Sequence, residues 1–200
     1  MSDMSSTFCD DDRLVVVDLE ATCDDRGAVP KEETEIIEIG AVLVHGHDYR
    51  LLADFQSFVR PIRHPRLTAF CTGLTSIGQE NVDAAPLFPE VVTAFKAWMH
   101  GQGATVFCSW GDYDRNQILM DCRLHRIAYP MPGRHVNLKR LFSETRGIKK
   151  RLGMGQALRE VGLQLIGTHH RGIDDARNIA RLLPYAAPHP TIQGPGPAAR

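Results

Sequence analysis

The stretch Leu14-Val15-Val16-Val17-Asp18-Leu19-Glu20 decides the fold of this chain, because it combines the composition of a buried strand with two acids at its end. Its three consecutive valines favour extended structure. Side chains alternate across a strand, so Asp18 and Glu20 point to one face while Leu19 points to the other. Two carboxylates are therefore predicted to share one small space at the carboxyl end of this strand.

Neighbouring carboxylates that leave bulk water need a partner, because desolvation and mutual repulsion both raise their free energy. A divalent cation is one general partner, and a shared proton or water is another. The alternative is that the strand ends at Val17 and that both acids are solvated. The remainder of the chain has to distinguish these two interpretations.

The length of 200 residues suits one domain, which we predict over residues 13–187. We expect a flexible amino end over residues 1–12 and a disordered tail, rich in Pro, Gly and Ala, over residues 188–200. The sequence has no run of about 18 apolar residues, and its acidic amino end differs from a secretory signal. Five scattered cysteines without a Cys-x-x-Cys spacing indicate reduced thiols. These features predict a soluble cytoplasmic protein that does not bind membranes.

The formal net charge of −1 hides a strong division along the chain. Residues 1–40 hold twelve acids and three bases, whereas residues 121–151 hold nine bases and two acids. An acidic pole beside a basic surface is typical of an enzyme that grips a polyanion and cuts it with the help of a cation. The alternative is a solvated basic face on an ordinary pair of helices.

Hydrophobic periodicity predicts the remaining elements. Further strands are expected at residues 36–44, 49–59 and 104–109, and helices at residues 89–99, 114–127, 154–161 and 174–183. Short connections join the first three strands into an antiparallel meander, and the crossover helix makes the fourth strand parallel to the first. The predicted fold class is α/β, with a ribonuclease-H-like mixed sheet of a three-strand meander plus parallel strands, flanked by helices.

Two other places carry acids that this layout brings to the first strand. Asp112 and Asp114 follow the fourth strand, so an acid there lies at the carboxyl edge of the sheet, where open α/β sheets place their sites. Asp174 is expected to be the N-cap of the last helix, which leaves Asp175 free to face the sheet. His170 lies in the preceding loop, and an imidazole can take a proton from water at neutral pH.

Three groups of carboxylates and one histidine suit a mechanism in which two Mg²⁺ ions, about 3.5–4 Å apart, assist the hydrolysis of a phosphodiester. Each residue also has a simpler interpretation, because Asp114 can merely cap a helix and His170 can be a surface histidine. All of them having no role together is less plausible than any one.

Five blocks of sequence resemble a known family. They are Val17-Asp18-Leu19-Glu20-Ala21-Thr22-Cys23, Glu35-Ile36-Ile37-Glu38-Ile39-Gly40, Phe70-Cys71-Thr72-Gly73-Leu74-Thr75, Ser109-Trp110-Gly111-Asp112-Tyr113-Asp114 and His170-Arg171-Gly172-Ile173-Asp174-Asp175-Ala176-Arg177-Asn178-Ile179-Ala180. In this order they resemble the DEDDh branch of the DnaQ-like 3′→5′ exonucleases, most closely the Eri/KapD subfamily that includes the 3′ histone mRNA exonuclease. The resemblance covers about residues 13–185. Asp-x-Glu alone is a weak motif, whereas five ordered blocks are specific.

The resemblance implies a role for each acid. Asp18 would bridge two metal ions, Glu20 and Asp175 would complete the shell of the first ion, and Asp114 would serve the second. His170 would be the general base. The implied cofactor is a pair of Mg²⁺ ions, for which Mn²⁺ would substitute. No dedicated protein partner can be inferred.

The family also implies contacts to the substrate. Its second-metal acid follows an aromatic residue, which selects Asp114 over Asp112, although Asp112 stays a candidate assistant. Phe70 and Tyr113 would clamp the terminal base, with Trp110 in reserve. Stacking on aromatic rings accepts any base, which suits an enzyme that retreats along a strand. The alternative is that both rings belong to the core.

Two further contacts follow from the same resemblance. Leu74 would act as a wedge near the last base step. Ala21 and Thr22 lie where a 2′-hydroxyl, which distinguishes RNA from DNA, would be contacted.

The sequence therefore predicts a metal-dependent 3′→5′ exonuclease that releases nucleoside 5′-monophosphates from single-stranded 3′ ends, with RNA favoured over DNA. A DNA exonuclease of repair or proofreading is the near alternative. A nucleic-acid-binding module without activity and an endonuclease of the same fold are more distant ones.

Overall fold

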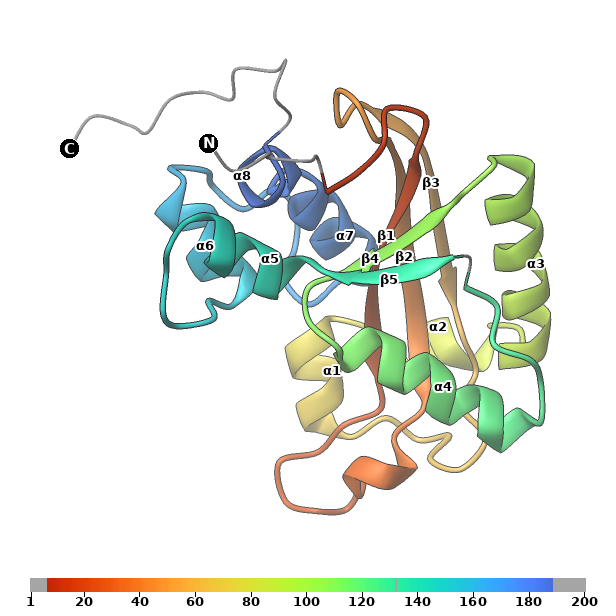
Figure 1. Cartoon of the computed structure of the whole chain (residues 1–200). Helices are drawn as coiled ribbons and strands as arrows, with labels where there is room; N and C mark the ends of the chain where they lie inside the picture. The colour runs from red at the N-terminus through yellow and green to blue at the C-terminus, as the bar shows by residue number, and fades with distance from the viewer. Residues whose placement is uncertain (1–6, 132, 189–200) are drawn as a thin grey trace.

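The computed structural model describes residues 7–131 and 133–188, and one five-stranded sheet lies at its centre (Figure 1). Its strands are β1 (Arg13–Ala21), β2 (Ile36–His45), β3 (Leu51–Phe58), β4 (Val106–Ser109) and β5 (Arg134–Asn137), in the order β3-β2-β1-β4-β5. β1 pairs with β2, and β2 with β3, in antiparallel fashion, whereas β4 is parallel to both β1 and β5. The predicted mixed sheet, a meander plus parallel strands, is confirmed.

Helices cover both faces of this sheet. They are α1 (Ala69–Thr75), α2 (Gln79–Asp83), α3 (Phe88–Gly101), α4 (Tyr113–His125), α5 (Leu138–Thr145), α6 (Met154–Glu160), α7 (Gly172–Ala180) and α8 (Leu183–Ala186), with a 3-10 turn at Lys31–Glu33. The sequence did not predict β5, α1, α2, α5 and α8, which are four to eight residues long, although it did predict β4 and α6 of similar length. Periodicity is an unreliable signal over so few residues. Among the described residues, no helix is long and apolar enough to cross a bilayer.

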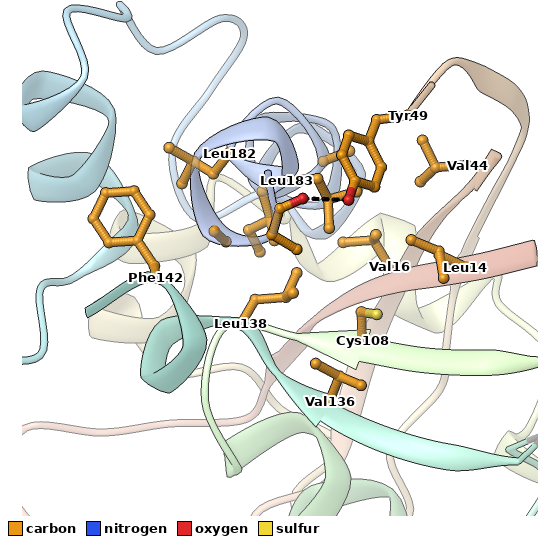
Figure 2. Packing of buried hydrophobic residues seen from close by; sticks show 14 of the residues in the cluster. Leu14, Val16, Val44, Tyr49, Cys108, Val136, Leu138, Phe142, Leu182 and Leu183 are labelled. Atoms are coloured by element: carbon orange, nitrogen blue, oxygen red, sulfur yellow. Dashed lines mark hydrogen bonds between the residues drawn. The ribbon is translucent and has the colours of Figure 1, made fainter. Parts of the chain in front are cut away.

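The alternation along β1 divides the core in two. Leu14 and Val16 point to the side of α5, α7 and α8, where Figure 2 shows them packed with Leu138 and other apolar residues. Val15 and Val17 point to the opposite side and pack against α3 and α4. Burial on both faces explains the unbroken apolar run. Because the alternation continues, the acids at positions 18 and 20 fall on the face that α7 covers.

Residues 7–12, the described part of the amino end that the sequence predicts to be flexible, contact the rest of the fold. Phe8 is 1% exposed, its ring lies edge-on to Tyr49 at 6.3 Å, and the guanidinium of Arg134 lies 5.6 Å from its centre. Gly46 N donates to Asp12 O at 2.8 Å, so burial and backbone pairing hold residues 7–12. Residues 1–6 and nearly all of the predicted tail, residues 189–200, lie outside the described residues.

Candidate active site

The carboxyl end of β1 forms the floor of a pocket in which the predicted acids meet. Carboxylate oxygens of Asp18, Glu20 and Asp175 lie within 4.8 Å of one another. Asp114, in the first turn of α4, lines the same pocket, and its Oδ1 accepts a hydrogen bond from Leu19 N at 3.1 Å. The structure thus brings together acids that are as much as 157 positions apart in the chain.

Strand pairing and one close approach explain this convergence. The parallel register of Val17 with Ser109 places the start of α4 beside the end of β1. On the other side, α7 crosses β2 so closely that a Cβ atom on Gly40 would lie 2.0 Å from the carbonyl carbon of Gly172. Two glycines therefore let α7 reach the sheet, and Asp175 comes over the acids of β1.

Glu38 holds the start of α7. Its buried Oε2 accepts hydrogen bonds from Arg171 Nε and Gly172 N, both at 3.1 Å, and its Oε1 accepts one from Gln56 Nε2 at 3.0 Å. The carboxylate therefore satisfies a backbone donor at the first position of the helix, although it belongs to β2.

This contact corrects the predicted start of the last helix. The helix begins at Gly172, and Asp174 is not its N-cap. Asp174 Oδ2 instead accepts from Thr168 N at 2.9 Å and holds the loop before the helix. A local pattern cannot show that Glu38, far away in sequence, supplies the acceptor at the helix start.

Burial raises the pKa of all four acids in the pocket, and repulsion between carboxylates adds to the shifts of Asp18 and Glu20. Burial raises the pKa of Asp18 well above its ordinary value, and the neighbouring carboxylates add to the shift, Asp114 most of all. Burial, then the charge of Asp175, raises the pKa of Glu20 to about 8. Burial raises the pKa of Asp114 to about 7 and also raises that of Asp175. The site therefore has a deficit of positive charge.

One atom marks where a cation fits. Asp175 Oδ1 is buried and accepts no hydrogen bond from the described residues, although buried polar atoms are nearly always satisfied. Asp18 and Glu20 place carboxylate oxygens within 4.8 Å of a carboxylate oxygen of Asp175. A donor set made of carboxylate oxygens suits Mg²⁺ or Mn²⁺, so these residues fit the metal that the sequence predicts.

Two histidines face the same acid. His170 lines the pocket with a positive φ of 62°, and its backbone N donates to Asp175 Oδ2 at 3.0 Å. Burial, and then His169, lowers the pKa of His170. Nδ1 of His169 lies 2.9 Å from the same Oδ2, and the two rings stack at 4.0 Å. The sequence argument missed His169, since only the spacing of His170 to Asp175 matches the family motif.

Four predicted substrate contacts line the pocket. They are Ala21, Leu74, Trp110 and Tyr113. Tyr113 is 55% exposed and Leu74 is 37% exposed, so neither belongs to the core. Trp110 is partly buried, and its Nε1 donates to Leu152 O at 3.1 Å, which ties the pocket wall to the loop before α6.

The remaining predicted contacts lie elsewhere. Thr22 is 1% exposed, and its hydroxyl accepts from Glu35 N at 2.9 Å, so it is directed away from the pocket. Phe70 is an exposed residue of α1 that does not line the pocket. Asp112 is also outside the lining, with its Oδ1 3.9 Å from His135 Nδ1.

Cys23 and Met154 line the pocket but were not predicted. Cys23 belongs to the first block of the family motif, which is a signal that the sequence argument did not use. Met154 comes from α6, where nothing in the local pattern indicates a site.

Comparison with known proteins places this geometry among nucleases. A family model described as "Exonuclease" matches residues 15–183. ERI1 exoribonuclease 3 of Mus musculus is 33% identical over 179 residues, which cover 85% of this chain and 52% of the relative. The 3′-5′ exoribonuclease 1 of Homo sapiens is 31% identical over 187 residues, which cover 88% of this chain and 53% of the relative. The chain thus spans about half the length of these relatives.

A solved structure shows the same fold. The nuclease domain of 3′hExo, described as a DEDDh family member bound to rAMP, has a TM-score of 0.80 and 30% identity. The match covers 89% of this chain and 92% of that domain.

Proposed function

This chain belongs to the exonuclease family, and on that premise we propose that it is a metal-dependent 3′→5′ exonuclease. Its products are nucleoside 5′-monophosphates, released from single-stranded 3′ ends, with RNA favoured over DNA. The observation that carries the proposal is the convergence of Asp18, Glu20, Asp114 and Asp175 in one pocket, where the buried Oδ1 of Asp175 accepts no hydrogen bond from the described residues. Hydrolysis of a phosphodiester needs a positive charge in this pocket, because negative charge develops on the oxygens of the reacting phosphate.

Each acid has a proposed role. Asp18 would be shared by two Mg²⁺ ions, Glu20 and Asp175 would help to hold one of them, and Asp114 would help to hold the other. When bound, such ions lower the pKa of water and neutralise the charge that develops on the leaving oxygen.

His170 is the proposed general base. Its lowered pKa keeps the imidazole neutral at pH 7, so that a ring nitrogen can accept a proton from the attacking water. His169 orients Asp175 through the contact between its Nδ1 and Oδ2.

The terminal nucleotide is proposed to lie against Tyr113 and Leu74. These exposed side chains come from α4 and α1 and line the pocket beside the acids. A stacked base contributes about 1–3 kcal/mol, and every base offers a π-face. RNA is favoured because the relatives named above are exoribonucleases.

Digestion of end-labelled single-stranded RNA and DNA, side by side, tests this function. We expect mononucleotides from the first time point with Mg²⁺ or Mn²⁺, and none with a chelator. Internal fragments would identify an endonuclease instead, and no cleavage with either metal would contradict the proposal.

DNA hydrolysis is the second candidate activity, and one observation favours keeping it. The Thr22 hydroxyl, a predicted contact to the 2′-hydroxyl of RNA, is bonded to Glu35 N within the protein. Equal rates on RNA and DNA would overturn the preference for RNA and leave the exonuclease activity in place.

A further inference from the structure

Two cysteines meet in the wall of the candidate active site. Cys23 follows β1 and lines the pocket, whereas Cys71 belongs to α1 and is 0% exposed. The hydroxyl of Thr68 donates to Cys23 O at 2.6 Å and accepts from Cys71 N at 3.0 Å, so one side chain ties the two backbones together.

The thiols are also in contact. The Cys71 Sγ donates to Ala21 O at 3.6 Å, and Cys23 packs against the small apolar cluster that contains Cys71. A side-chain hydrogen bond joins the two sulfur atoms. The other three cysteines lie apart from this pair, since Cys9 is exposed and Cys108 and Cys122 belong to the two cores on the sheet faces.

This hydrogen bond makes the pair acidic. Because Cys23 donates to it, the pKa of Cys71 is lowered to about 7, while the same bond, followed by burial, raises the pKa of Cys23. The negative charge therefore rests on the Cys71 sulfur, and Cys23 keeps the proton of the bond. Thiolates, not thiols, react with oxidants, so Cys23, which lines the pocket, becomes reactive when its proton passes to Cys71.

We propose that Cys23 and Cys71 form a redox modification site, at which a hydroperoxide that enters the pocket converts the pair into an intramolecular disulfide. The Cys23 sulfur attacks the terminal peroxide oxygen as its proton passes to the Cys71 thiolate, the O–O bond breaks, and the alkoxide leaves and takes up a proton from water. The Cys71 sulfur then attacks the sulfenic acid, and hydroxide leaves with the Cys71 proton as water. Two thiols lose two electrons and two protons, and the hydroperoxide becomes an alcohol and water.

The disulfide would change the pocket, because it joins the segment after β1 to α1. Ala21 and Leu74 line the pocket from these two elements. A covalent link fixes the wall that contacts the terminal nucleotide, so we expect hydrolysis to fall. This effect rests on the proposed function, whereas formation of the disulfide does not.

Treatment of the full chain with hydrogen peroxide, followed by intact mass measurement and peptide mapping, tests the proposal. We expect the loss of two hydrogen atoms and a linked pair of peptides that contain Cys23 and Cys71. Cys23→Ser must abolish this link, whereas Cys9→Ser, at an exposed cysteine, must leave it unchanged. Cys71→Ala serves as a second variant, and circular dichroism shows whether each variant is folded.

Hydrolysis is measured on the same samples. We expect a severalfold loss of rate in the oxidised wild type, recovery with dithiothreitol, and no such reversible loss in Cys23→Ser. Absence of the linked peptides, or the same link in Cys23→Ser, overturns the modification site. Linked peptides in a protein that never hydrolyses nucleic acid would refute the proposed function alone.

Discussion

The protein contains two groups of buried acids: those of the pocket, and a second group near the same edge of the sheet. The two groups differ in how their carboxylates are hydrogen-bonded or paired. The carboxylate of Glu35 accepts three backbone hydrogen bonds, of 2.7, 2.7 and 2.9 Å, from residues 62–64. Glu38 is paired with Arg171 and Gly172. We call these two acids, together with Asp121, the satisfied acids.

Asp121 completes this group from α4. Its Oδ1 accepts from Ile36 N at 3.1 Å, and its Oδ2 accepts from Gln117 Nε2 at 2.7 Å. Each satisfied acid joins segments that are far apart in sequence. Burial still raises the pKa of Asp121 to about 6. The acids of the pocket, in contrast, face one another, and the charges of neighbouring carboxylates add to the effect of burial on the pKa of Asp18 and Glu20. Burial alone therefore does not indicate a functional acid, whereas unbalanced like charge does.

The largest effect is expected for Asp18→Asn, which should change the rate of hydrolysis without lowering the free energy of unfolding. Asp18→Asn should lower the rate of hydrolysis by about 10³-fold or more, because it removes the proposed bridging ligand. The free energy of unfolding should stay the same or rise, since one of several repelling charges is lost. Single-turnover hydrolysis and urea unfolding measure the two effects. Undiminished hydrolysis would refute the role of the pocket.

A satisfied acid should show the reverse behaviour. Glu38→Ala should lower the free energy of unfolding by about 3 kcal/mol, because it leaves Arg171 without its buried partner. Glu38→Gln should cost less, since an amide oxygen can still accept from Gly172 N. Urea unfolding of both variants measures the difference. Equal stability of Glu38→Ala and wild type would remove the basis for calling Glu38 structural.

The raised pKa values predict how pH affects the metal-free protein. Glu20 and Asp114 rise from 4.5 and 3.8 to about 8 and about 7, so the folded state binds more protons than the unfolded state between these limits. Stability in chelator should therefore be greatest at the acid end and fall as pH rises toward 8.

Bound metal should oppose this loss. At pH 8, Mg²⁺ at 100 times its dissociation constant should restore about 2.7 kcal/mol. Melting curves at several pH values, with chelator or Mg²⁺, measure both effects, and Glu20→Gln should flatten the chelator curve. A stability that rises from pH 5 to pH 8 in chelator, in wild type but not in that variant, would contradict the assignment.

The smallest effect is expected for Asp121→Asn, which is compared with a variant of Asp114 in the same helix, α4. Asp121→Asn should cost about 1 kcal/mol of stability, because one of two accepted hydrogen bonds is weakened, and should leave hydrolysis within about twofold of wild type. Asp114 belongs to the same helix but lines the pocket, so Asp114→Asn should abolish most hydrolysis. Parallel assays of the two variants test whether position on α4 decides the role, and similar losses in both would contradict it.

Long periodic segments were predictable from local patterns. The runs of β1 and β2 and the apolar stripe of α3 identified their elements, and chain connectivity then gave the antiparallel meander and the parallel β4. The short elements β5 and α5 were missed although β4 and α6, of similar length, were found, because a period is an unreliable signal over four to eight residues. Phe8 was missed because a single buried ring in an acidic segment carries no pattern.

The acids of the pocket were predictable for a similar reason. Asp18 and Glu20 follow from alternation along a strand, and an acid after β4 follows from connectivity, although only the family resemblance selected Asp114 over Asp112. Asp175 and His170 were expected near the start of the last helix, although the N-cap expected at Asp174 is wrong, and the resemblance gave them their roles. Thr22 and Phe70, which the resemblance also indicated, lie outside the pocket, because the direction of a side chain depends on its neighbours in space.

Local order along the chain is sufficient to specify the sheet and to show which acids belong together, because strand alternation and connectivity are properties of neighbouring residues. The contact of Gly40 with Gly172, the hold of Glu38 on α7 and the meeting of Cys23 with Cys71 arise only when the folded chain is assembled. Each joins segments far apart in sequence, and its energy depends on distances that no local pattern encodes.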